Sequence, residues 1–159
     1  MGGLKLLVAH VGSPRLAFIR EGVEHFRGRI RHLAALRLLE VREEALRKGM
    51  TPQEVQQKEQ KRLEGIMDRR YQWVVLDENG QSFRSAELAA LLDSWMQHGK
   101  SQVAFLVAGP CGLSPEILAR AELRLSLSPL TYSHETALLV LLEQLYRILA
   151  ILNRLPYPR

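Results

Sequence analysis

The sequence predicts a single-domain α/β fold in which helices flank a largely parallel sheet. Apolar runs of strand length alternate with longer amphipathic segments along the whole 159-residue chain, and this alternation is typical of βαβ units. The composition, 47% hydrophobic and 25% charged, is that of a globular protein long enough to bury its own core. We therefore expect one domain over residues 1–159.

The first third should form a strand, a helix and a second strand. Leu4 to Val11 is a compact apolar run that ends at Gly12, as a buried strand would. Ser13-Pro14 supplies an N-cap and a first-turn proline for a helix that runs to about Ile30. Residues 33–41 favour a second strand, although their alanine and leucine content also allows a helix.

The middle of the chain carries a clear helix start and a strand. Thr51-Pro52-Gln53-Glu54 is a capping box with proline at the first helical position, so a polar helix should run to about Met67. Tyr71 to Leu76 is aromatic and β-branched, which favours a strand. The turn-prone residues Asp77 to Gly80 are expected to end that strand.

The second half repeats the alternation. Ser85 to His98 has the apolar stripe of an amphipathic helix. Val103 to Ala108 lacks polar alternation, as a central strand covered on both faces does. Ser114-Pro115-Glu116 should cap the next helix, residues 125–127 should form the last short strand, and a long helix should follow from about His134 to Leu152.

The final helix is apolar nearly all round, which predicts a partner. One subunit's sheet can bury only part of such a surface, and a large exposed apolar patch is unfavourable in a monomer. A membrane span is the competing interpretation, but Glu143, Gln144 and Arg147 interrupt the apolar run before it reaches ~20 residues. We therefore expect a homodimer through this helix and no membrane association.

The net charge of +5 is unevenly placed along the chain. Residues 1–70 hold 15 of the 22 Lys and Arg against nine acids, whereas residues 71–159 hold seven against eight. A basic half beside a near-neutral half suits a phosphate-contacting surface next to a neutral cofactor pocket. Ordinary solubility charge explains the same asymmetry equally well.

The termini and the cysteine content limit the class of protein. The first residues, MGGLKLLVAHVG, lack a basic leader and read as a strand, so we expect a cytoplasmic protein. The single cysteine, Cys111, excludes an intrachain disulfide and leaves too few thiols for a cysteine-built metal site. No paired base is evident for Cys111 as a nucleophile, so packing is the better interpretation.

Two loops are the candidates for ligand binding. No G-x-G-x-x-G follows an expected strand, so the common dinucleotide fingerprint is absent. Gly109 to Gly112 follows the central strand, at the edge where open α/β sheets bind ligands. Alone, this loop indicates only a tight strand-to-helix turn. Together with the second loop, Leu127 to Tyr132, it favours a binding site.

Three motifs in order, GPCGLSP, LSPLT and LEQLYR, carry a family resemblance. They resemble the catalytic half of the SPOUT RNA methyltransferases, and most closely the small pseudouridine N3-methyltransferases of the large ribosomal subunit. The resemblance covers nearly the whole chain. It implies a deep trefoil knot in the cofactor-binding region, about residues 71–159, a homodimer, S-adenosyl-L-methionine as cofactor, and methylation of N3 of a pseudouridine in 23S ribosomal RNA.

The resemblance also implies site residues. The implied cofactor contacts are Leu76, Ala108, Gly109, Leu127, Ser128, Pro129, Leu130, Thr131 and Tyr132. The polar candidates for catalysis are His134, Tyr157 and Arg159. His134 or Tyr157 would accept or relay the N3 proton, and Arg159 would favour the anionic base or grip a phosphate. Alternatively, His134 caps the helix or orders the loop, and the last residues form a disordered tail.

Three departures from the family pattern affect substrate handling. Pro158 replaces the usual tail histidine, Leu138 replaces a frequent arginine, and Cys111 replaces an often polar residue. Two alternatives follow: a catalytically weak knotted protein that binds RNA or assists ribosome assembly, and a SPOUT methyltransferase with another RNA target.

Basic residues of the first half are the candidates for contact with ribosomal RNA in the large subunit or the assembled ribosome. They are Arg15, Arg20, Arg27, Arg29, Arg31, Arg37, Arg42, Arg47, Lys48, Lys58, Lys61 and Arg62. For any one of them, a solvated face is the ordinary explanation.

Overall fold

The structure is a computed structural model that describes residues 3–157. Within these residues one sheet has the strand order β2-β1-β4-β3-β5, and all of its pairings are parallel. The strands are β1 (Lys5–Val11), β2 (Ala35–Val41), β3 (Gln72–Ser82), β4 (Gln102–Val107) and β5 (Leu123–Ser126). This confirms the predicted α/β class, and β2 is a strand rather than a helix.

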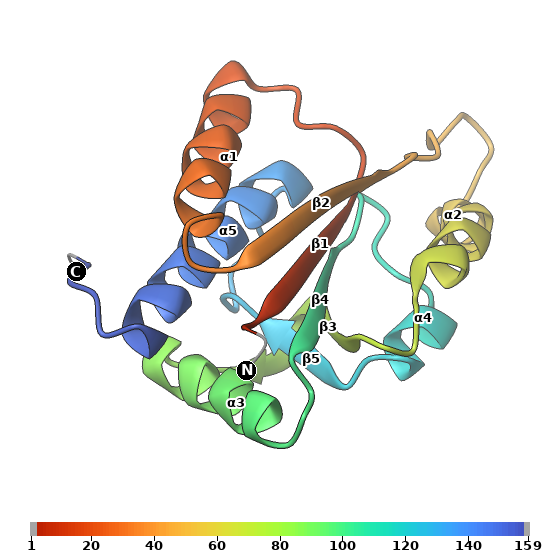
Figure 1. Cartoon of the computed structure of the whole chain (residues 1–159). Helices are drawn as coiled ribbons and strands as arrows, with labels where there is room; N and C mark the ends of the chain where they lie inside the picture. The colour runs from red at the N-terminus through yellow and green to blue at the C-terminus, as the bar shows by residue number, and fades with distance from the viewer. Residues whose placement is uncertain (1–2, 158–159) are drawn as a thin grey trace.

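Helices cover both faces of the sheet (Figure 1). On one face lie α1 (Ala17–Ile30), α3 (Ser85–Gln97) and α5 (His134–Leu152), with α5 in contact with both other helices. On the other face lie α2 (Pro52–Ile66) and the short α4 (Pro115–Ala119). The two strands of the basic half, β1 and β2, lie side by side and join the three strands of the second half through the β1–β4 pairing, so the two halves of the chain share one sheet.

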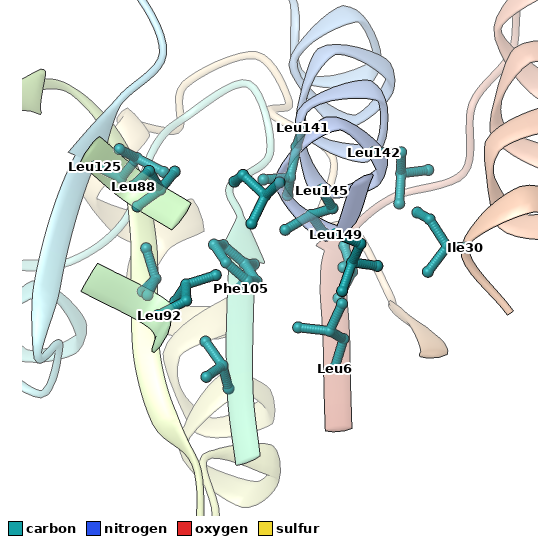
Figure 2. Packing of buried hydrophobic residues seen from close by; sticks show 14 of the residues in the cluster. Leu6, Ile30, Leu88, Leu92, Phe105, Leu125, Leu141, Leu142, Leu145 and Leu149 are labelled. Atoms are coloured by element: carbon teal, nitrogen blue, oxygen red, sulfur yellow. The ribbon is translucent and has the colours of Figure 1, made fainter. Parts of the chain in front are cut away.

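Strand β4 is central and divides two hydrophobic clusters. Its alternate residues Val103 and Phe105 face the α1/α3/α5 layer, whereas Ala104 and Leu106 face α2 and α4. All four are fully buried, which confirms the expectation of a strand covered on both faces. Figure 2 shows Phe105 among leucines of α3 and α5 in the larger cluster.

Helix α5 has the predicted bounds, and its own chain buries most of it. Leu141, Leu142, Leu145 and other residues of its inner face pack in the larger cluster with α1, α3 and the sheet. A methyl group on Gly22 of α1 would lie 2.7 Å from Leu139 Cδ1, so α1 and α5 cross in close contact. The helices α1 and α3 thus cover part of the apolar surface of α5 that we expected a second chain to cover.

Helix α1 starts later than predicted. Its N-cap position is Leu16, whose side chain cannot accept a hydrogen bond, and Ser13-Pro14 is therefore not the cap. The Ser13 hydroxyl instead donates to Glu40 Oε1 at 2.5 Å, and the Arg15 N–H donates to Glu135 Oε2 at 2.6 Å. These bonds tie the segment to β2 and to the start of α5, so the chain stays non-helical until Leu16.

The expected turn at Asp77 to Gly80 is wrong, because β3 continues through it to Ser82. Leu76 and Gln81 both pair with Leu125 of β5, so the four residues between them bulge out of the ladder. A bulge of this kind needs no chain reversal. The polar residues of the bulge instead form part of the cleft wall described below.

The other element predictions are close to the structure. The Thr51 hydroxyl accepts from the Glu54 N–H and the Glu54 carboxylate accepts from the Thr51 N–H, which confirms the capping box of α2. The Ser114 hydroxyl caps α4, and β5 begins two residues earlier than expected. No helix in the described part of the chain is long and apolar enough to cross a membrane. The trefoil knot remains a prediction.

Candidate functional site

A cleft of about 600 Å³ opens at the carboxyl ends of β3, β4 and β5. Its walls come from three consecutive strand ends and the loops that follow them: the β3 bulge, residues 108–113 and residues 127–134. Gln56 of α2, Leu118 of α4 and Ala137 of α5 complete the lining. This is the edge at which open parallel sheets bind ligands, and the volume is in the ordinary range for a small-molecule site.

The glycine loop, Gly109 to Gly112, is compact and fixed from two sides. Gly112 has φ +74° and donates its N–H to Gly109 O at 3.0 Å. A methyl group on Gly109 would lie 3.0 Å from Val11 Cγ1, so glycine allows the loop to pack directly on β1. From α2, the Gln56 Nε2–H donates to Cys111 O at 2.6 Å.

The second loop is attached to the β3 bulge. The Ser126 hydroxyl lies 3.1 Å from Glu78 O and 3.0 Å from Ser128 O, and the Thr131 hydroxyl donates to Glu78 Oε2 at 2.5 Å. Leu130 is 71% exposed. The loop therefore has a polar attachment to β3 and an apolar rim at the mouth of the cleft.

The structure places eight of the nine predicted cofactor residues around this cleft. They are Leu76, Ala108, Gly109, Leu127, Ser128, Leu130, Thr131 and Tyr132. Pro129 is exposed and lies outside the lining. The sequence interpretation missed Asp77, Glu78 and Asn79, although a polar run directly after a strand was a usable signal, and it missed Gln56, for which nothing local gave a signal.

His134 lies at the cleft, and its role in catalysis stays a prediction. It is the first residue of α5 and is part of the cleft lining. Ser133, not His134, caps the helix, because its hydroxyl accepts from the Thr136 N–H at 3.2 Å. Of the roles considered for His134, helix capping is thus excluded.

Tyr157 lies at the opposite end of α5. This helix has 19 residues, so its ends are about 27 Å apart at 1.5 Å per residue. The Tyr157 ring packs edge-on against Tyr146 at 4.8 Å, with the Arg147 guanidinium 4.4 Å from its centroid. Burial, followed by the charge and hydrogen bond of Glu143, raises the pKa of the phenol, which favours its protonated form.

One chain therefore does not bring the catalytic candidates together. Tyr157 lies away from His134 and from the cleft, and Arg159, with Pro158, lies outside the described residues. Leu138, at the position of a frequent family arginine, is 1% exposed and packs in the larger cluster.

Cys111 has the surroundings of a packing residue. Burial raises the pKa of its thiol, and the negative charges of Glu59 and Glu43 raise it further. A protonated thiol is a poor nucleophile. Among residues 3–157 no group of three or more His, Cys, Asp and Glu side chains is placed to hold a metal ion.

The chain matches a family model described as "Predicted SPOUT methyltransferase" over residues 4–158. The chain belongs to the SPOUT methyltransferase family. Among similar proteins, ribosomal RNA large subunit methyltransferase H of Geobacter metallireducens is 35% identical over 154 residues, which cover 97% of this chain and 98% of the relative. The relative of the same name from Symbiobacterium thermophilum is 36% identical over 153 residues, covering 93% and 95%.

A solved structure shares the fold of this SPOUT chain. It is that of Lpg2936 from Legionella pneumophila with the bound cofactor SAM. The match has a TM-score of 0.53 and 16% sequence identity, and covers 91% of this chain and 66% of that chain. At this level of identity the likeness concerns the fold.

Proposed function

We propose that this protein transfers a methyl group from S-adenosylmethionine to N3 of a pseudouridine in 23S ribosomal RNA of the large subunit. The observation that carries the proposal is the full-length match to relatives named ribosomal RNA large subunit methyltransferase H, joined to the cleft behind the glycine loop. The pseudouridine and its N3 atom come from the motif resemblance. A ribosomal substrate implies a cytoplasmic location.

The cleft suits a nucleoside-sized cofactor. When bound, S-adenosylmethionine supplies an activated methyl group. Ala108 and Gly109 would offer backbone donors and acceptors to the adenine edge. Leu76 and Leu127 would pack on its apolar surface, and Thr131 would close the site through its bond to the β3 bulge.

The protein's remaining tasks are alignment of the base and removal of the N3 proton. His134 is the proposed proton acceptor, because its side chain lines the cleft and histidine is the side chain that most often serves as a general base. Tyr157 is better suited to donate a hydrogen bond than to accept a proton, since the pKa of its phenol is raised.

We infer that a homodimer completes the site. Near the start of α1, Leu16 and Phe18 are 46% and 63% exposed, and Ile151 and Leu155 at the far end of α5 are 42% and 44% exposed. The Arg15 N–H bond to Glu135 places the starts of α1 and α5 together, so these two apolar patches lie at opposite ends of one helical layer.

A two-fold axis across that layer would place each apolar patch on the partner's other patch, as an isologous interface requires. The same rotation would carry the partner's Tyr157 toward this chain's cleft. Such a dimer would bring His134 of one chain and Tyr157 of the other together, although within one chain they lie at opposite ends of the 19-residue helix α5.

The proposed RNA surface is the basic first half, where Arg20, Arg27 and Arg29 of α1 and Lys58 and Lys61 of α2 are exposed. Arg15 is a specific candidate, because its side chain is 85% exposed even though it pairs with Glu43 at 3.7 Å. Phosphate contacts of this kind would orient the large-subunit RNA without reading its sequence.

Two measurements test the proposal. Calorimetry with S-adenosylhomocysteine should show binding to the purified protein, and its absence would refute a cofactor role for the cleft. Incubation with labelled S-adenosylmethionine and large ribosomal subunits should then transfer label to 23S RNA. If the protein binds S-adenosylhomocysteine and RNA but transfers no label, it is the catalytically weak RNA-binding protein that the changes at Leu138 and Pro158 suggest.

A further inference from the structure

Helix α2 makes polar contacts on two sides of its inner face. On one side, the Gln56 Nε2–H donates to Cys111 O of the glycine loop at 2.6 Å. One turn later, Glu59 Oε1 accepts the Glu44 N–H at 2.9 Å. The helix is thus bonded both to the wall of the cofactor cleft and to the basic segment, which we define as residues 42–48.

Glu59 is a costly residue to keep at its position. It is 2% exposed, and its Oε2 is buried with no hydrogen-bond partner among the described residues. A buried carboxyl left partly unpaired is destabilising, so an apolar side chain would pack there at lower cost. Its retention is better explained by the Glu44 N–H that it holds.

Glu59 also lies against the glycine loop. A methyl group on Gly109 would be 3.8 Å from Glu59 Oε1, and one on Gly112 would be 3.7 Å from Gln56 Nε2. The two α2 side chains therefore occupy the space directly behind the loop, and any shift of the loop must be accommodated by them.

The basic segment is attached to α2 by further bonds. Arg62 donates to Arg42 O at 3.0 Å and to Glu44 Oε2 at 2.8 Å, and Lys58 pairs with the same carboxylate at 3.8 Å. Because these bonds hold the backbone of the segment, its exposed residues Arg42, Arg47 and Lys48 stay available to phosphate groups.

We propose that Gln56 and Glu59 are positioning residues that couple cofactor binding at the glycine loop to RNA binding at the basic segment. The inference rests on the proposed function. A cofactor that fixes the loop also fixes Gln56 and the face of α2 that holds Glu44. By thermodynamic linkage the coupling is reciprocal, so each ligand raises the affinity for the other by the same factor.

The test uses the full chain, S-adenosylhomocysteine and large ribosomal subunits. Calorimetry gives the affinity for S-adenosylhomocysteine, and filter binding gives the affinity for subunits with and without it. The wild type should bind subunits at least about fivefold more tightly when S-adenosylhomocysteine is saturating, as for a typical coupling. Gln56→Ala should bind S-adenosylhomocysteine about three- to tenfold more weakly, as expected for one lost hydrogen bond, and should lose the coupling.

Matched variants separate positioning from folding. Glu59→Gln keeps an oxygen for the Glu44 N–H and should retain the coupling, whereas Glu59→Leu fills the space without an acceptor and should lose it. Gln57→Ala, at an exposed neighbouring position of α2, should behave as the wild type in both assays.

Two outcomes would overturn the inference. If Gln56→Ala and Glu59→Leu fold and show the wild-type response to S-adenosylhomocysteine, the inference fails while the proposed function stands. If the wild type binds no S-adenosylhomocysteine, the proposed function and the inference fail together.

Discussion

The substitution Gly80→Ala should damage both the β3–β5 junction and the cleft. A methyl group at this position would lie 2.5 Å from Arg124 O and 2.7 Å from Arg124 C, which are backbone atoms of β5. To restore an ordinary contact of 3.4 Å, β5 must move back by about 0.9 Å. Overpacking that no side-chain rotation can relieve should cost about 2 to 3 kcal/mol, or roughly 4–12 °C in Tm for a chain of this size.

Gly65→Ala is the matched control for this substitution. Gly65 lies in the last turn of α2, and a methyl group there meets nothing within 4 Å, so alanine should stabilise the helix by about 0.5 to 1 kcal/mol. Urea unfolding of both variants at one protein concentration gives the difference. Gly80→Ala should also weaken S-adenosylhomocysteine binding, because the bulge lines the cleft. Equal stability of the two variants would refute the assigned β3–β5 geometry.

Four further predictions address the core, a buried acid, the cleft and the proposed dimer. Leu142→Ala, at a fully buried position, should lower the free energy of unfolding, measured by urea denaturation, by about 2 to 5 kcal/mol. A smaller decrease would mean that α5 packs less tightly than described. The pKa of the Glu59 carboxyl is raised, chiefly by burial. Protonated Glu59 therefore stabilises the fold fully below the ordinary pKa of 4.5, and this stabilisation is lost as pH rises through the pKa of the folded state. The stability of Glu59→Gln relative to the wild type should thus increase between pH 5 and pH 8, and a difference in urea unfolding that does not change with pH would contradict this. Thr131→Val removes the hydroxyl that is bonded to Glu78 and should weaken S-adenosylhomocysteine binding in calorimetry about three- to tenfold. Unchanged affinity would mean that this bond does not contribute to cofactor binding. Phe18→Glu should disrupt the proposed homodimer and give monomers in sedimentation, whereas a variant that sediments as a dimer like the wild type would place the interface elsewhere.

Local signals in the sequence predicted most of the fold. The absence of polar alternation in β4 identified the central strand, because a strand covered on both faces has no polar side. The capping box at Thr51 fixed the start of α2 through bonds between residues three apart. The bounds of α5 were predicted correctly for the same reason, since its start and end are set by nearby residues.

The errors come from contacts between residues far apart in the chain. Ser13 was expected to cap a helix, but its partner is Glu40, and Arg15 is held by Glu135. Asp77 to Gly80 were expected to turn, but pairing with β5 on both sides keeps them in a strand. The place of Gln56 in the cleft likewise depends on a loop 55 positions away. Local propensity does not show whether a contact with a distant part of the chain will replace a local cap or turn.

The most direct test of the central claim is to map methylated nucleotides in ribosomal RNA from the native host. Mass spectrometry of 23S RNA should be compared between cells that carry the gene, cells from which it is deleted, and cells in which it is restored. The account predicts one pseudouridine that carries an N3 methyl group only when the protein is present. An unchanged methylation pattern, or a lost methyl group on any other atom or RNA, would contradict it.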